Sequence, residues 1–276
     1  MIADGPDRLY VELMKQVLLG QTETGGDGLI PWAVTGLRGA VADRVLAGQG
    51  VITAKREPVF GDDIVEEGLY WKAPPRGYTM IGRKRLDHLG WCVETVLREG
   101  VPGQLIETGV WRGGATLLMR AVLAAHGDGA RKVFVADSFA GLPTPDVARH
   151  PADSSSTLHM NKDLAIPLTA VRANFERFGL LDDQVEFVEG WFRDTLPGLS
   201  EQTWALIRLD GDLYESTMDG LEHLYPQLAP GGFLIVDDYR AYESCRTAVE
   251  DYRNRHSITT GLEAIDWSGV YWRRPW

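Results

Sequence analysis

The sequence predicts an α/β fold in which a mostly parallel sheet is flanked by helices and closed by an antiparallel hairpin at the C-terminus. The first reason is that, from Gln104 onward, short β-branched or apolar runs alternate with amphipathic segments. The second is that the last two runs meet at Ser268-Gly269, a tight-turn signal, with no helix between them. Such a hairpin separates the expected topology from an ordinary dinucleotide-binding fold.

Five strands that alternate with helices, followed by a closing pair, are expected along the chain. The strand runs are Gln104–Val110, Lys132–Phe139, Val185–Trp191, Ala205–Asp210, Phe233–Val236, Leu262–Trp267 and Val270–Arg273. Amphipathic segments predict helices at Leu9–Leu19, Lys84–Leu97, Ala115–His126, Leu168–Gly179, Glu215–Leu228 and Glu243–His256. Pro226 conflicts with the end of the fifth helix, so we expect that helix to end early or to kink there.

Residues 1–77 differ from the rest and are expected to form an N-terminal helical extension and lid, whereas residues 78–276 form the main domain. A glycine-rich join at Gly25–Gly28 follows the first helix, and the stretch between Gly36 and Arg76 has no clean periodicity. The insertion Leu142–Ile166, after the second predicted strand, is rich in Pro, Asp, Ser and His and is a second candidate cover.

The composition excludes several classes of partner. A net charge of -11 opposes binding to nucleic acid, because that binding depends on Lys and Arg neutralising phosphates. No apolar run resembles a signal peptide or is long enough to span a bilayer, so we expect a cytoplasmic protein without membrane contact. Cys92 and Cys245 lack metal-ligand spacing and are expected to be buried free thiols.

The first predicted strand of the sheet runs into an acid and a glycine-rich turn, Glu107-Thr108-Gly109. In an open α/β sheet, ligands bind at the carboxyl ends of the strands, where glycines let the backbone approach the ligand. Glu107 would then meet a cationic or hydroxylated group, although a plain structural turn remains the alternative. Trp111 occupies the third position of the Gly-x-Gly-x-x-Gly pattern, where a dinucleotide motif needs glycine, which argues against NAD.

Two further strand ends extend this candidate site. The second strand ends in Asp137-Ser138, where an acid typically accepts hydrogen bonds from ribose hydroxyls; the alternative is a simple cap. The third strand ends in Gly190-Trp191, which offers an aromatic face for adenine, although core packing explains Trp191 equally well. The candidate nucleoside-donor site comprises Thr79, Met80, Glu107, Thr108, Gly109, Asp137, Ser138, Gly190, Trp191 and Asp210. For Thr79-Met80, which precedes a helix, an apolar staple is the alternative.

Four carboxylates form the strongest cluster. Asp210 and Asp212 follow the fourth strand, and Asp237-Asp238 follows the fifth, so all four are expected at adjacent strand tips. Their mutual repulsion requires a cation or raised pKa values, and oxygen ligands favour Mg²⁺; solvated turn acids are the alternative. With Asp210, Asp237 and Asp238 as metal ligands, Asp212 is free to act as general base. His159 in the insertion is the rival base, with a surface role as its alternative.

These ordered motifs resemble the macrocin and mycinamicin type (TylF-like) of sugar O-methyltransferase, which includes an aminocoumarin noviose methyltransferase. The resemblance covers residues 78–276 and rests on Tyr78-Thr-Met-Ile-Gly82, Glu107-Thr-Gly-Val-Trp-Arg-Gly-Gly114, Ala136-Asp-Ser-Phe139, Asn174-Phe175, Gly179-Leu-Leu-Asp-Asp-Gln-Val185, Leu209-Asp-Gly-Asp-Leu-Tyr214, Pro230-Gly-Gly-Phe233 and Asp237-Asp238-Tyr239. It implies a class I methyltransferase fold with a Rossmann-like sheet, S-adenosylmethionine as donor, and Mg²⁺. It also implies a homo-oligomer, a dimer or tetramer, with N-terminal segments helping to cover neighbouring sites.

By position, the resemblance places Asp210, Asp237 and Asp238 at the family's metal ligands and Asp212 at its base, and it assigns Glu107, Asp137 and Ser138 to donor binding. The expected reaction is methyl transfer to a deoxysugar hydroxyl of a glycosylated natural product in antibiotic biosynthesis. A catechol-type O-methyltransferase is the alternative within the same chemistry, since Tyr70, Trp71 and Tyr78 near the lid suit either acceptor. A nucleoside-binding oxidoreductase and a non-catalytic nucleoside-binding module are the alternatives of another class.

Overall fold

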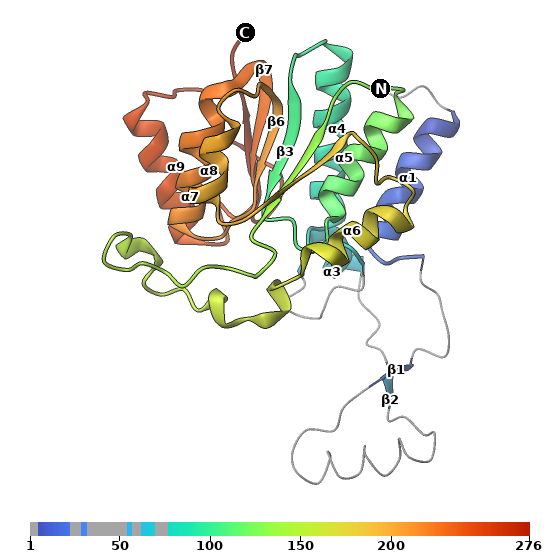
Figure 1. The fold of residues 1–276 in the computed structure, drawn as a ribbon, viewed down its shortest axis with the longest axis horizontal. Helices are drawn as coiled ribbons and strands as arrows, with labels where there is room; N and C mark the ends of the chain where they lie inside the picture. The colour runs from blue at the N-terminus through green and yellow to red at the C-terminus, as the bar shows by residue number, and fades with distance from the viewer. Residues whose placement is uncertain (1–4, 23–28, 32–53, 57–61, 70–76) are drawn as a thin grey trace.

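The chain is described by a computed structural model over residues 5–22, 29–31, 54–56, 62–69 and 77–276. Its main sheet has seven strands in the order β5-β4-β3-β6-β7-β9-β8 (Figure 1). The strands are β3 (Gln104–Thr108), β4 (Val133–Asp137), β5 (Val185–Glu189), β6 (Trp204–Leu209), β7 (Leu228–Val236), β8 (Glu263–Ala264) and β9 (Val270–Arg273). The first five strands in this order, from β5 through β4, β3 and β6 to β7, pair in parallel. Strand β9 pairs antiparallel with both β7 and β8. The predicted α/β fold with a closing antiparallel hairpin is therefore confirmed.

The hairpin connection is longer than the two-residue turn predicted at Ser268-Gly269. Residues 265–269 separate the two strands, and the Asp266 carboxylate accepts hydrogen bonds from the backbone N–H of Ser268 (2.9 Å) and Gly269 (2.7 Å). The Asp266 side chain thus bonds backbone N–H groups two and three residues later in the chain, in place of strand pairing. The predicted strand Leu262–Trp267 is therefore reduced to Glu263–Ala264.

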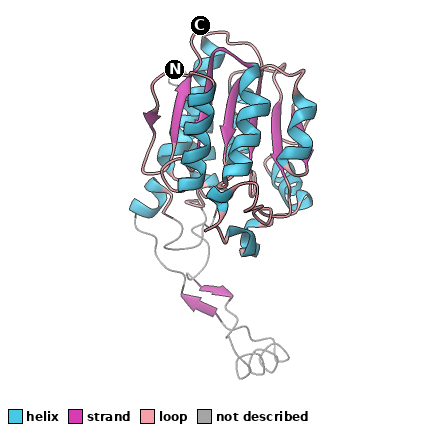
Figure 2. Ribbon diagram, turned by 90° about the vertical axis from the view of Figure 1, so that its left-hand side faces the viewer, coloured by secondary structure: helices cyan, strands magenta, loops and turns pink. Residues whose placement is uncertain are grey.

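Two layers of helices cover the sheet (Figures 1 and 2). One apolar core joins the sheet to α1 (Pro6–Leu18), α4 (Arg83–Arg98), α5 (Gly114–Ala125) and α6 (Leu168–Arg177). The other joins it to α8 (Tyr214–Leu224) and α9 (Glu243–Arg255), with the short α7 (Phe192–Thr195) beside them. Cys92 lies in the first core and Cys245 in the second, both as buried free thiols, which confirms that expectation.

Pro226 ends the fifth predicted helix early, as expected. Helix α8 stops at Leu224, and residues Tyr225–Gln227 form a 3₁₀ turn, because proline cannot donate the backbone hydrogen bond that would continue the helix. Leu228 was predicted to be helical but instead begins β7, so this strand begins five residues earlier than the predicted start at Phe233.

The N-terminal region contributes to the main core. The buried residues Val11 and Leu18 of α1 join the same apolar cluster as α5. Helix α3 (Asp62–Glu67) lies before α4, and β1 (Leu29–Pro31) pairs antiparallel with β2 (Ala54–Arg56) in a separate two-stranded sheet that the sequence did not predict. The Gly25–Gly28 join, most of the stretch Gly36–Arg76, and the lid aromatics Tyr70 and Trp71 lie outside the described residues. No helix in the described ranges is both long and apolar enough to cross a membrane.

Candidate active site

Three cavities meet at the carboxyl ends of the central strands, and Asp212 lines all of them. The narrow cavity, lined by Gly109, Asp137, Gly190 and Trp191, has a volume of about 90 Å³. The acidic cavity, lined by Glu107, Asp210, Asp237 and Asp238, has about 920 Å³. The hydroxyl groove, lined by residues 154–158 of the insertion and by Ser244 and Thr247 of α9, has about 510 Å³.

The narrow and acidic cavities share Met80, Gly109 and Asp210 and are therefore neighbours. A pocket that holds a small organic ligand usually encloses about 300–1,000 Å³, so the narrow cavity alone is too small for a nucleoside with a side chain. A donor whose base lies near Trp191 must therefore extend past Gly109 toward the acids.

Gly109 is required by packing at the end of β3. Its φ is +84°, and a Cβ built on it would lie 1.7 Å from the carbonyl oxygen of Asp210. Any side chain here would push β3 away from the loop after β6 and separate Asp210 from Glu107. Thr108 is buried, and its carbonyl accepts a hydrogen bond from the Asp210 N–H (2.9 Å), so it joins the two loops through its backbone and lines none of the three cavities.

Asp137 organises the turn that follows β3. Its carboxylate accepts hydrogen bonds from the backbone N–H of Val110 (2.7 Å) and of Phe139 (2.8 Å), while the Ser138 hydroxyl donates to the Gly141 carbonyl (2.6 Å). Burial raises the pKa of Asp137, and these backbone donors oppose that shift. Asp137 and Ser138 also line the narrow cavity, so capping this turn leaves both residues next to that cavity.

The remaining predicted donor residues lie on the same two cavities. Gly190 and Trp191 line the narrow cavity, Met80 lines both, and Thr79 lines the acidic cavity. The Thr79 hydroxyl accepts a hydrogen bond from the Ile81 N–H (3.3 Å), which orders the turn before α4. The structure thus brings together every predicted donor residue at this edge except Thr108, whose side chain faces the core.

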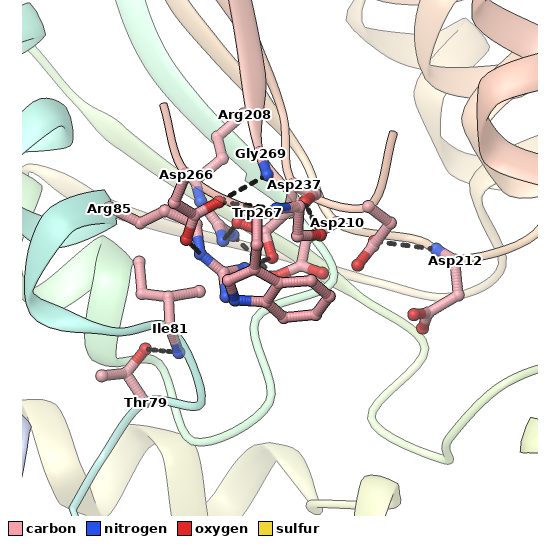
Figure 3. Close-up of polar contacts among 12 residues, drawn as sticks. Thr79, Ile81, Arg85, Arg208, Asp210, Asp212, Asp237, Asp266, Trp267 and Gly269 are labelled. Atoms are coloured by element: carbon pink, nitrogen blue, oxygen red, sulfur yellow. Dashed lines mark hydrogen bonds and ion pairs between the residues drawn. The ribbon is translucent and has the colours of Figure 1, made fainter. Parts of the chain in front are cut away.

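Two buried arginines, which the sequence analysis missed, pair with three of the predicted site acids and with a fourth acid, Asp266 (Figure 3). Arg208 on β6 donates to Glu107, to Asp210 (2.7 Å) and to Asp237. Arg85 on α4 donates to the other oxygen of Asp237 and forms an ion pair with Asp266 (2.8 Å). We call these six residues, Glu107, Asp210, Asp237, Asp266, Arg85 and Arg208, the acid–arginine cluster. The missed signal was an arginine within the otherwise apolar strand Trp204–Leu209.

Glu107 retains one unused acceptor within this cluster. Its Oε2 is buried and has no hydrogen-bond partner among the described residues, although Oε1 is paired with Arg208. Burial raises the pKa of Glu107 to about 8, against the lowering effect of Arg208 and with a further rise from Asp210 and Asp237. An unsatisfied acceptor on the wall of the acidic cavity fits a ligand that brings a hydrogen-bond donor, such as the ammonium group of an amino-acid moiety.

A divalent ion fits beside the cluster. One carboxylate oxygen from each of Asp210, Asp237 and Asp238 can be chosen so that all three lie within 4.8 Å of one another. An all-oxygen donor set suits a hard cation such as Mg²⁺. Both oxygens of Asp237 already accept hydrogen bonds from arginines, so Asp210 and Asp238 have the freer lone pairs.

Asp212 differs from the other acids in geometry. It lies to one side of the acid–arginine cluster (Figure 3), and its backbone has the left-handed φ of +60°, which is uncommon outside glycine. Its N–H points at the Asp238 carboxylate (3.3 Å), while its own carboxylate has no hydrogen-bond or ion-pair partner in the described part of the chain. Burial, together with Asp210 and Asp237, raises the pKa of Asp212 to about 8.

His159, the rival base, is not among the residues that line these three cavities. Its Nδ1 is buried and has no partner among the described residues, within the 3₁₀ turn Leu158–Met160. Its predicted catalytic role therefore has no geometric support, whereas Asp212 borders all three cavities.

The fold and the site together define a class I O-methyltransferase: a Rossmann-like sheet with an antiparallel closing strand and acids at the carboxyl ends of its central strands. The sequence profile of the macrocin O-methyltransferase (TylF) family matches residues 7–274. The chain therefore belongs to the macrocin O-methyltransferase family, and the resemblance found in the sequence is confirmed.

Characterised relatives are similar over most of their length. An 8-demethyl-8-(2,3-dimethoxy-alpha-L-rhamnosyl)-tetracenomycin-C 4'-O-methyltransferase from Streptomyces olivaceus is 60% identical over 72% of this chain and 77% of its own. A mycinamicin III 3''-O-methyltransferase from Micromonospora griseorubida is 49% identical over 82% and 87%. The solved structure of the O-methyltransferase NovP superposes with a TM-score of 0.81 at 41% identity, covering 98% of this chain and all of that one. The methyltransferase fold implies S-adenosylmethionine as the methyl donor.

Proposed function

We propose that this enzyme transfers the methyl group of S-adenosylmethionine to a sugar hydroxyl of a glycosylated natural product, with Mg²⁺ as cofactor, in antibiotic biosynthesis. The observation that carries the proposal is the position of Asp212. This carboxylate, which has no partner among the described residues, borders the narrow cavity, the acidic cavity and the hydroxyl groove, next to three oxygen-donor acids within 4.8 Å of one another.

In this proposal the narrow cavity and Glu107 hold the donor. Trp191 packs on the adenine, Asp137 and Ser138 face the ribose, and Glu107 Oε2 accepts from the ammonium group of the methionine moiety. Thr79 and Met80 close over the donor from the turn before α4. Fixing the sulfonium in this way would hold the methyl group for transfer, and positioning of this kind can lower a barrier by several kcal/mol, roughly 7 to 11 in ideal cases.

Asp212 acts as the general base. It accepts the proton of the acceptor hydroxyl while the oxygen forms a bond to the methyl carbon and the carbon–sulfur bond breaks, leaving a methyl ether and S-adenosylhomocysteine. When bound by Asp210, Asp237 and Asp238, Mg²⁺ supplies Lewis acidity to vicinal acceptor oxygens. Arg85 and Arg208 hold Glu107, Asp210 and Asp237 in place before any ligand arrives.

The names of the relatives refine the acceptor. The Streptomyces olivaceus relative is named for transfer to position 4' of a rhamnose that carries methoxy groups at positions 2 and 3. A methoxy oxygen can replace a hydroxyl as the second vicinal oxygen, so a free sugar diol is not required. We propose that this chain acts on a sugar with one free hydroxyl beside another ring oxygen substituent.

The test is methyl transfer from S-adenosylmethionine to four acceptors: that rhamnosyl-tetracenomycin, mycinamicin III, demethyldecarbamoylnovobiocin and catechol. We expect transfer to at least one glycoside, loss of transfer with a chelator, and recovery with added Mg²⁺. Transfer to catechol alone would instead support the catechol-type alternative. Undiminished activity after thorough chelation would remove the metal from the proposal.

The domain division and the oligomer are also proposed. We propose that residues 1–77 form an extension that helps to cover the site of residues 78–276, and that the chain forms a homo-oligomer, a dimer or tetramer. Leu9 and Leu13 support self-association because these neighbours on one face of α1 are 72% and 53% exposed. Light scattering should give a multiple of the 30.6 kDa chain mass, and Leu9→Glu with Leu13→Glu should lower it.

A further inference from the structure

We propose that the hydroxyl groove binds the part of the acceptor that lies beyond the methylated sugar, and that it selects an uncharged, hydroxyl-bearing glycoside over a sugar carried on a nucleoside diphosphate. This inference rests on the proposed function, since it names the class of acceptor for the same site.

The first step is the position of the groove. It shares Asp212 with the narrow and acidic cavities and shares Tyr242 with the acidic cavity. From an acceptor hydroxyl held at Asp212, the rest of the molecule can extend into any of these three cavities. The donor takes the narrow cavity and the adjoining part of the acidic cavity, and the groove of about 510 Å³ is large enough for an organic group of moderate size.

The second step is the chemistry of the lining. Hydroxyl side chains dominate the groove, and its lining residues are Pro151, Ala152, Ser154, Ser155, Ser156, Thr157, Leu158, Asp212, Tyr242, Glu243, Ser244 and Thr247. Its charged members, Asp212 and Glu243, are both acids, and this lining holds no Lys or Arg. A diphosphate in the groove would meet like charge and no basic side chain of its lining, whereas hydroxyl, ether and carbonyl groups find hydrogen-bond partners there.

The third step is Tyr242, which stands between the groove and the acidic cavity. The residue is 38% exposed, and its hydroxyl has no hydrogen-bond partner in the described part of the chain. The backbone fixes its position, because the Tyr242 N–H donates to the Asp238 carbonyl (2.9 Å). An aromatic face with an unused phenol beside Asp212 suits a sugar ring, which has apolar C–H faces and polar edges.

The fourth step is that both walls are fixed. On the insertion, Asp153 is 1% exposed and accepts the backbone N–H of Tyr214 (2.7 Å) and of Glu215 (3.1 Å) at the start of α8. On the other wall, the Ser244 hydroxyl donates to the Asp212 carbonyl (3.0 Å). Both walls of the groove are therefore anchored to residues 212–215, the segment after β6 that carries Asp212.

The experiment compares two acceptors with the same sugar. One is the rhamnosyl-tetracenomycin described above, and the other is methyl 2,3-di-O-methyl-α-L-rhamnoside, which lacks the polycyclic portion. Thr247→Trp fills the groove, and we expect it to lower kcat/KM for the large acceptor relative to the small one by about tenfold or more, mainly through KM. Arg246→Trp is the matched control, because Arg246 is exposed, adjacent in sequence and absent from the lining of the groove.

A second arm uses Tyr242→Phe and a nucleotide sugar. The phenylalanine variant keeps the ring and removes the phenol, so KM for the large acceptor should rise by about threefold to tenfold while kcat changes less. Thymidine diphosphate L-rhamnose should be methylated at least about a hundredfold less efficiently than the neutral glycoside. Calorimetry with S-adenosylmethionine on each variant verifies that the donor site is intact.

Three outcomes would overturn the inference. The first is that Thr247→Trp lowers kcat/KM equally for both acceptors, and the second is that Arg246→Trp has the same effect as Thr247→Trp. The third is efficient methylation of the nucleotide sugar, whose diphosphate would then bind near Arg112 and Lys162 in the acidic cavity. Failure of the wild-type enzyme to methylate any glycoside is a separate result, which overturns the proposed function and this inference with it.

Discussion

The acids at the carboxyl edge of the sheet fall into two groups that differ in how their charge is balanced. Glu107, Asp210 and Asp237 are each paired with a buried arginine. Asp212 and Asp238, only a few residues away, have no arginine ion pair among the described residues. Burial raises the pKa of all four of Glu107, Asp210, Asp212 and Asp238, but Arg208 opposes that rise only at Glu107 and Asp210. The two groups therefore share a location but have different electrostatic surroundings.

This difference separates framework from reactive groups. The Asp237 carboxylate is fixed in place because both of its oxygens accept hydrogen bonds from guanidinium groups, so neither oxygen is free to take a proton from an acceptor. Asp212, which lacks a counter-charge and has a raised pKa, is a better base, because proton affinity rises when the charged form is less stabilised. The arginines thus explain how so many acids can share one edge before a cation binds.

Removing the base should have the largest effect. Asp212→Asn keeps the volume but cannot accept the proton, so we expect kcat to fall by about 10²- to 10⁴-fold, the usual contribution of general base catalysis. Binding of S-adenosylmethionine, measured by calorimetry, should be retained. His159→Gln is the matched test of the rival base and should leave kcat within about threefold; the reverse ranking of these two variants would transfer the role to His159.

Removing the shared arginine should have the next largest effect, and on stability. Arg208→Met leaves Glu107, Asp210 and Asp237 buried without their common partner, so we expect a loss of about 3–5 kcal/mol in the free energy of unfolding. Added Mg²⁺ should restore part of it. The exposed Arg246, 3.5 Å from Glu243, is the control, and Arg246→Met should cost less than about 1 kcal/mol. Comparable losses in the two variants would contradict the framework role.

The fold could be predicted from the sequence because periodicity and strand-end chemistry are local signals. The alternating runs after Gln104 place all seven strands of the main sheet, and Pro226 marks the end of α8. The connection at residues 265–269 could not be predicted, because it depends on Asp266, whose carboxylate bonds the local backbone and also pairs with Arg85 on α4. That pairing joins positions far apart in the chain.

The acidic residues of the site could be predicted from the sequence, but its two buried arginines were missed. Asp210, Asp237 and Asp238 were found because each follows a strand, and the structure brings them within 4.8 Å. Arg85 was hidden because it lies on a helix and reaches the site only through tertiary packing. A single sequence can indicate which strand ends are adjacent, but it does not indicate which face of a helix packs over them.

The pH dependence of stability should show a smaller effect that distinguishes Asp212 from the arginine-paired acids. The folded pKa of Asp212, about 8, lies above its value of about 4 in an unfolded chain. Between these values the folded state holds a proton that the unfolded state has released, so stability falls as pH rises through this window. Without divalent ions, Asp212→Asn should be more stable than wild type at about pH 8, by about 1–2 kcal/mol, and closer to it at about pH 5.

Denaturant unfolding at these two pH values, in a chelator, measures the effect. Mg²⁺ should reduce the difference between the two proteins at the higher pH, because a cation beside Asp210 and Asp238 stabilises the ionised form of Asp212. A wild-type protein whose advantage over Asp212→Asn grows with pH would contradict the assignment of Asp212 to the unpaired group.

Asp153 provides the smallest and most local test, since it is a buried acid balanced by neither an arginine nor a cation. Its two oxygens accept the N–H groups of Tyr214 and Glu215 at the first turn of α8, where the helix dipole favours a negative charge. Asp153→Asn removes that charge with little change in shape and should cost about 0.5–2 kcal/mol in unfolding free energy. Asp146→Asn, an exposed acid of the same insertion, should cost less than about 0.5 kcal/mol. Equal costs for the two would mean that the charge of Asp153 is not what anchors the insertion to α8, and that helix-end N–H groups balance a buried acid less well than arginines do.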